Sequence, residues 1–146
     1  MPSNYFALET SIKTHLQDID SIQAVYTPFS VDDMLQATAV APSISIIYVD
    51  DRVGESVGNG TASVVYQQWL IVLCVEEAGS QLEDTTLVRS AASPFIIEIL
   101  KRMQGFNPQV AGFKQFKRAN AGVQHMSAAG KLWLPYLFEC QMINSF

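Results

Sequence analysis

Charged residues and long apolar runs are both scarce in this 146-residue sequence. Asp, Glu, Lys and Arg make up 16% and hydrophobic residues 49%, which excludes an intrinsically disordered chain, because disorder needs few apolar residues and high net charge. The longest uninterrupted apolar run, Trp69–Val75, is far shorter than the roughly 20 residues of a membrane-spanning helix. Residues 1–7 lack the basic region and apolar core of a signal peptide. We therefore expect one domain over residues 1–146, made in the cytoplasm and without a membrane partner.

Histidine and cysteine, which carry much of enzyme and metal chemistry, occur only twice each. His15 and His125 stand alone, with no metal-ligand spacing around them. Cys74 and Cys140 both fall inside strand-like apolar patterns, so we expect two buried thiols that pack as small apolar side chains. No nucleophile elbow or phosphate-binding Walker loop occurs.

Carboxylates are the remaining candidates for a metal or acid–base site. Asp32–Asp33 and Asp50–Asp51 are adjacent pairs, but neighbouring residues on a strand point to opposite faces, so such a pair does not converge on one ion. We interpret both pairs as solvated. The sequence therefore predicts no catalytic residue, no metal and no cofactor, and a protein that is not an enzyme.

The formal net charge of −5 conceals an uneven distribution. Residues 1–85 hold twelve acidic and two basic residues, whereas residues 86–146 hold two acidic and seven basic residues. Lys114, Lys117 and Arg118 lie among Phe113 and Phe116. This cluster has three readings: a solvated rim, a patch that matches the acidic half of a neighbouring copy, or a nucleic-acid surface in which aromatics stack on bases.

Helical patterns occur near the N-terminus and again after residue 30. Apolar residues recur at helical spacing between Leu8 and Ile19, which predicts a helix over about residues 5–20. Ser30 followed by Asp32 and Asp33 is typical of a capped helix start, and predicts a short helix to about Ala37.

A longer helix is predicted over about residues 82–104. Ser80–Glu83 matches a capping box, and Gly105 is a suitable end. Pro94 lies inside this segment, where it either bends one long helix or opens a second one with Ser93 as its cap.

Strand patterns fill most of the remaining sequence. Ser43–Asp50 alternates, and Ser63–Glu76 is apolar on both faces over its core, which predicts a central strand; Asp51–Thr61, rich in glycine, reads as a mobile connection between them. A short strand is predicted near Phe113–Arg118, and a closing strand, buried mainly on one face, over residues 132–142. Pro135 in the closing strand requires an edge or a bulge there.

Together with an extended segment at residues 23–28, these elements define an α+β fold. We expect a mainly antiparallel sheet, with an N-terminal helix and a kinked central helix packed on it, and a strand–long loop–strand arm.

The second half of the chain resembles the tail terminator, or tail-completion, proteins of long-tailed bacteriophages. The resemblance rests on the helix with Ser93–Leu100, the following Met103–Pro108 turn and the closing Pro135–Cys140 strand. It implies a structural virion protein, located in the neck at the top of the tail. Such a protein forms a hexameric ring that caps the tail tube, ends polymerisation and offers a surface for head joining.

The resemblance also implies partners. These are further copies of the chain, the tail tube protein, a head-closure or connector protein, and a sheath terminator where the tail is contractile; genomic DNA passes through the lumen without specific binding. Because a ring uses a heterologous contact, the charge split predicts a subunit interface between two sets of residues, the acidic Asp50, Asp51 and Glu55 and the basic Lys114, Lys117 and Arg118. The glycine-rich loop is predicted to contact the tube or neck through Arg52, Gly54, Gly58, Asn59 and Gly60.

Two alternatives stay open at this point. The protein could be a head-closure or neck adaptor of the same virion. It could instead belong to a different class, a small-molecule-binding module whose pocket is lined by the strands of Trp69 and Trp133.

Overall fold

The computed structural model describes residues 4–37, 40–76, 86–128 and 130–144. Three helices accompany a six-stranded sheet in these residues, in the order α1 (Ala7–Leu16), β1 (Ala24–Tyr26), α2 (Val31–Ala37), β2 (Ser43–Val57), β3 (Ala62–Glu76), α3 (Thr86–Met103), β4 (Phe113–Ala119), β5 (Met126–Ala128) and β6 (Lys131–Asn144). The strand order is β1-β2-β3-β6-β4, and β5 also pairs with β6. Every pairing is antiparallel except that of β1 with β2. The predicted α+β class with a mainly antiparallel sheet is therefore confirmed.

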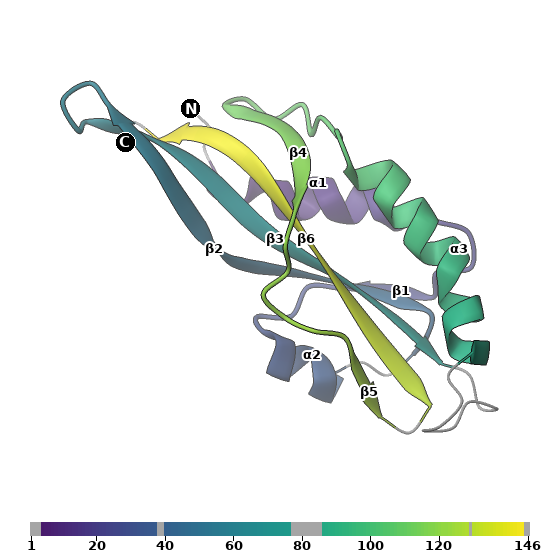
Figure 1. Ribbon diagram of the computed structural model, residues 1–146. Coiled ribbons are helices and arrows are strands. Elements are labelled where there is room, and N and C mark those ends of the chain that lie inside the picture. The colour runs from purple at the N-terminus through teal and green to yellow at the C-terminus, as the bar shows by residue number, and fades with distance from the viewer. Residues whose placement is uncertain (1–3, 38–39, 77–85, 129, 145–146) are drawn as a thin grey trace.

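The helices cover both faces of the sheet. Buried residues of α1 and α3 share one apolar core with alternate residues of the strands, whereas Met34 of α2 belongs to a second core on the other face. Figure 1 shows α1 and α3 along one side of the sheet and the short α2 apart from them. The apolar stripe of α1 makes it pack there, because Leu8, Ile12 and Leu16 are fully buried, each stabilising the fold by about 1.5–3 kcal/mol.

The predicted caps of α2 and α3 have different outcomes. The Asp33 backbone N–H donates to Ser30 Oγ over 3.1 Å, which confirms the predicted start of α2. The Ser80–Glu83 capping box lies outside the described residues. Pro94 lies inside one continuous helix, so the alternative of a second helix opening at Ser93 is wrong, and the bend itself stays a prediction. Gly105, with φ of +76°, follows the end of α3, as expected for a glycine cap.

The long connection predicted over Asp51–Thr61 is mostly strand. β2 continues to Val57 and β3 begins at Ala62, so only residues 58–61 form the turn. The alternation that marks β2 is interrupted by register shifts between Tyr48 and Asp50 and between Val53 and Ser56, and such bulges disguise the pattern in a sequence. The outer part of this hairpin, residues 53–64, is called the hairpin arm below; it projects at the upper left of Figure 1.

β6 is more buried than its alternation predicts. Phe138, Cys140 and Met142 pack in the core under α1 and α3, as expected, but Trp133 and Leu137 are also buried, in the second core. The outer ladder of β6 has a gap, since β5 pairs with it as far as Trp133 and β4 begins at Leu137. Pro135 lies in this gap, which confirms that it occupies a local edge.

Candidate assembly surfaces

Asp51, a predicted interface residue, is held within its own subunit. Its carboxylate accepts hydrogen bonds from the hydroxyls of Tyr5 and Tyr48, the latter over 2.7 Å. Burial, followed by the bond to Asp51, raises the pKa of Tyr5 to about 12 and raises the pKa of Tyr48 as well. Asp51 therefore joins the segment before α1 to β2. Asp50 and Glu55 are exposed, and neither forms an ion pair with another described residue.

Arg52, predicted to contact the tube or neck, is also engaged within the subunit. Its guanidinium donates to both carboxylate oxygens of Glu139, over 3.0 and 2.8 Å, and lies 4.2 Å from the centre of the Tyr66 ring. Gln68 donates to the same carboxylate over 2.8 Å. The bond from Arg52 is the main cause that lowers the pKa of Glu139. Arg52 thus connects β2 to β6 across β3, away from the turn of the hairpin.

The aromatic residues of the basic cluster are part of the core. Phe116 is fully buried and Phe113 nearly so, so neither ring is available to stack on a nucleic-acid base. Lys114 and Lys117 are exposed. Arg118 is exposed as well, and its guanidinium lies 5.3 Å from the centre of the Tyr136 ring. Phe113 and Phe116 are three residues apart rather than two, because the register of β4 shifts between them, and both rings are buried in the core.

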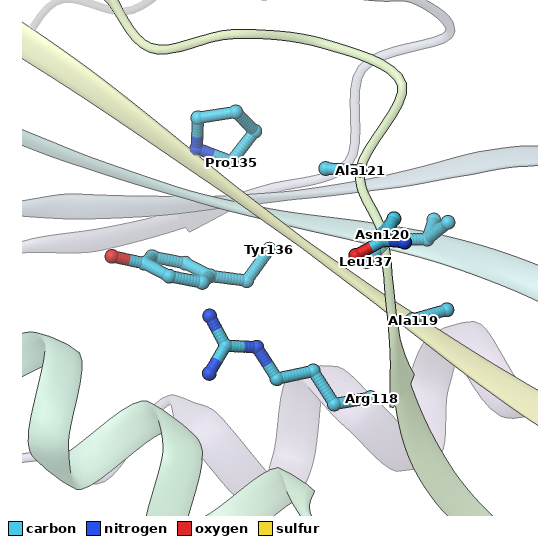
Figure 2. Close-up of a pocket in the computed structure, with 7 residues that line it drawn as sticks. All are labelled: Arg118, Ala119, Asn120, Ala121, Pro135, Tyr136 and Leu137. Carbon is cyan, nitrogen blue, oxygen red and sulfur yellow. The ribbon is translucent and has the colours of Figure 1, made fainter.

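Arg118 and Tyr136 line a depression at the gap between β4 and β5. Figure 2 shows the guanidinium directed toward the tyrosine ring, with Pro135 on the far side of β6. The depression has a volume of about 430 Å³ and is also lined by Ala119, Asn120, Ala121 and Leu137. Arg118 is therefore oriented by its own subunit, unlike the two neighbouring lysines.

The predicted acidic and basic interface residues lie on two strands that are separated by two others in the same sheet. Asp50 and Glu55 belong to β2, Lys114 and Lys117 belong to β4, and both β3 and β6 lie between these strands. These four predicted interface residues are therefore separated in space as well as in sequence, and a head-to-tail contact between copies brings two such different surfaces together.

The two sides differ in how their backbone edges are covered. β1 pairs with β2 only at residues 43–45, and no other described strand covers the outer edge of β2 from Ile46 onward. Val49, Val53 and Val57 are exposed along it. On the other side, Phe116 exchanges two backbone hydrogen bonds of 2.9 Å with Gly105 and Phe106, which caps the middle of β4. An open edge with exposed valines is a surface that other chains readily cover.

The turn of the hairpin arm contains three of the predicted contact residues. Gly58, Asn59 and Gly60 have φ values of +61°, +58° and +86°, a conformation that glycine and asparagine tolerate best. Gly54 lies further back, where a Cβ atom would come within 3.2 Å of the Tyr66 ring. The turn is thus formed by residues suited to its geometry, and all its side chains are exposed.

A second depression opens between α3 and the strands β5 and β6. It has a volume of about 340 Å³; Ala92, Ile96, Leu132 and Leu134 provide apolar lining, and Arg89, His125 and Ser127 complete it. The tryptophans proposed for a small-molecule pocket do not share a cavity, because Trp69 and Trp133 are buried in different cores on opposite faces of the sheet.

His15, the other histidine, connects two helix ends. Its ring stacks on Phe106 at a centroid distance of 3.7 Å, and Nε2 lies 2.8 Å from the carbonyl oxygen of Arg102. Arg102 in turn pairs with Asp18 and Glu98. These contacts join α1 to α3. Arg102 is therefore already paired within its own subunit.

Sequence patterns did not reveal the residues that hold the side chains of Asp51 and Arg52 in place. Tyr5, Gln68 and Glu139 have partners that are 46 to 87 positions away in the chain, so no local pattern marks them. Tyr48 lies only three residues from Asp51, but a register shift in β2 between Tyr48 and Asp50 hides this contact from a period-two pattern. One weak signal exists: Glu139 is one of only two acidic residues after position 85, and a lone acid inside a strand often has a cationic partner.

Neither a metal centre nor a membrane helix is found in the described ranges. They contain no group of three or more His, Cys, Asp or Glu residues able to hold a metal ion. No helix within them is long and apolar enough to cross a bilayer.

Comparison with known proteins identifies the family. The family profile described as phage tail terminator protein matches residues 1–145, and the chain belongs to this family. It is therefore a structural protein of the phage tail, and its place is the virion. No curated protein matches the sequence.

A solved structure supports the same fold. A chain from the virion of a native gene transfer agent particle superposes with a TM-score of 0.58 at 12% sequence identity, over 95% of this chain and 96% of that chain. The resemblance to tail terminators that the sequence predicts is thus confirmed by the family match.

Proposed function

We propose that the protein forms a hexameric ring on the last ring of the tail tube, where it ends polymerisation and presents a surface to the head. The observation that carries the proposal is the separation of charge across the sheet, with the exposed carboxylates of Asp50 and Glu55 on β2 and the exposed Lys114 and Lys117 on β4. A closed ring places one such side against the other at every junction. The exposed valines on the open edge of β2 give this contact an apolar component.

Within this proposal the two surfaces of the ring have different partners. The turn of the hairpin arm, Gly58–Thr61, contacts the tail tube or the neck, because it projects from the sheet and its side chains are exposed. The opposite surface of the ring meets the other of these two partners. The neck partner is a head-closure or connector protein, and a sheath terminator is added where the tail is contractile. Genomic DNA passes through the lumen without specific contacts, since the aromatics of the basic cluster are buried.

The decisive experiment compares tails assembled with and without the protein. We expect tails to exceed their normal length when the protein is absent, and the purified protein to form rings with a central hole in electron micrographs. Tails of normal length that merely fail to join heads would favour the neck-adaptor alternative. Tails of normal length that join heads efficiently would contradict both roles.

A further inference from the structure

Phe29 is an exposed aromatic side chain without a structural role in its own subunit. It is 95% exposed, although a phenyl ring gains substantial free energy when it is buried. It immediately precedes the cap of α2, and the first turn of that helix carries Asp32 and Asp33. Ser30 bonds to Asp33, whereas Asp32 is exposed and has no ion-pair partner among the described residues. The start of α2 thus presents an exposed apolar ring and, three residues later, an exposed carboxylate.

The depression between α3 and β6 has the opposite features. Ala92, Ile96, Leu132 and Leu134 provide the apolar part of its lining, and its volume of about 340 Å³ exceeds the roughly 150 Å³ of a cavity that binds benzene. Arg89 lies at this depression and forms no ion pair within the described residues, and the exposed His125 offers a second nitrogen donor. The depression therefore suits an apolar ring that has a carboxylate next to it.

The two features are in different layers of the same subunit. α2 packs through Met34 on one face of the sheet, whereas Ala92, Ile96, Leu132 and Leu134 belong to the face that α1 and α3 cover. A subunit therefore cannot readily fill its own depression with its own Phe29. A second copy of the chain can do so, and the contact is heterologous, as a ring demands.

We infer that Phe29 of one subunit inserts into the depression between α3 and β6 of the next, with Asp32 facing Arg89. The inference rests on the proposed ring and names a contact that holds it together. An aromatic anchor in an apolar pocket, with a charge pair at its rim, is the pattern of an interface hot spot. Truncation of such an anchor weakens association by roughly 30-fold or more.

Cysteine cross-linking tests the inference directly. In virions that carry Phe29→Cys together with Ser127→Cys, oxidation is expected to give a ladder of covalent oligomers on a denaturing gel. Each single cysteine variant is expected to run as a monomer on the same denaturing gel, because the contact joins two different surfaces and does not bring two copies of one cysteine together. The native Cys74 and Cys140 are buried and do not compete. A dimer from Phe29→Cys alone would overturn the inference in favour of a two-fold contact.

Substitutions at the proposed contact provide a second test of the inference. Phe29→Ala and the pocket-filling Ser127→Trp are expected to weaken ring formation, measured by sedimentation, whereas Ile97→Ala, which removes an exposed apolar residue outside the depression, should not. Asp32→Arg is expected to weaken the ring, and Arg89→Asp in the same chain should restore it. If every variant forms intact rings and no cross-links appear, the inference is overturned and the proposed function still stands. If the wild-type protein forms no ring at all, the proposed function itself is contradicted.

Discussion

Arg52 on β2 and Glu139 on β6 are joined by two hydrogen bonds of 3.0 and 2.8 Å, although 87 positions separate them in the chain. The bonds cross β3, which lies between the two strands, and Gln68 of β3 donates to the same carboxylate. This network holds β2, β3 and β6 together just before the hairpin arm departs from the body of the molecule.

Replacement of Glu139 by Gln is expected to lower the melting temperature and to make the hairpin arm exchange its amide protons faster. The folded-state pKa of Glu139 is lowered, mainly by Arg52, so the stabilisation is present above the unfolded pKa of about 4.3 and is lost as the pH falls through the folded value. The difference between wild type and variant, measured by urea unfolding, should therefore shrink below about pH 4. An equal difference at every pH would contradict this account.

Tyr5→Phe is expected to destabilise the protein by about 1 kcal/mol, because a hydrogen bond to the Asp51 carboxylate is lost. The raised pKa of Tyr5, about 12, means that its contribution is complete below about pH 10, the unfolded value, and is lost as the pH rises toward the folded value. The stability of the wild type should fall over this alkaline range more steeply than that of the variant. Urea unfolding together with tyrosinate absorbance measures both quantities, and parallel curves would count against the assignment.

Shortening the hairpin arm tests whether the arm is needed for joining to the tail but not for folding. Val53 and Val65 are paired across β2 and β3, so residues 54–64 can be replaced by Asn-Gly, which favours a tight two-residue turn. The variant is expected to keep its circular dichroism spectrum and cooperative melting but to lose joining to the tail. Ile97→Ala, which changes an exposed residue of α3 outside the arm, serves as the control and should join normally. Normal joining by the shortened chain would remove the arm from the contact surface.

Charge reversal tests the contact between copies. Lys114→Glu with Lys117→Glu should prevent ring formation at low salt, and Asp50→Lys with Glu55→Lys in the same chain should restore it, because both sides of every junction then carry the opposite sign. Arg118→Gln is the comparison variant, since Arg118 lies against Tyr136 of its own subunit. Sedimentation over a range of salt concentrations measures the effect. Rings that persist in the doubly reversed lysine variant would refute this interface.

Much of the secondary structure could be predicted because it follows from local periodicity. The stripe of Leu8, Ile12 and Leu16 defines α1, and the apolar run Trp69–Val75 defines the central strand. The bulges of β2 could not be predicted, because a shift of register erases the period-two pattern on which strand prediction depends. The glycines near the turn then made a paired strand look like a loop.

The environment of each candidate residue also could not be predicted from local sequence. Sequence alone identified an acidic and a basic half, but not which charged groups are held by other residues of the same subunit. Asp51, Arg52 and Arg118 are each engaged within the subunit, whereas Asp50, Glu55, Lys114 and Lys117 are exposed and form no ion pair among the described residues. That difference depends on contacts across strands, which composition does not encode.

The sequence by itself determined the class of fold, the family and the absence of familiar catalytic motifs, since these depend on local pattern and on residue types. Only the tertiary structure decided that β2 has an open edge while β4 is capped, and that Phe29 and the depression beside Arg89 lie in different layers. The reason is physical: edges, faces and cavities exist only after distant segments pair and pack, and the free energy of an assembly contact depends on which groups remain exposed once they have done so.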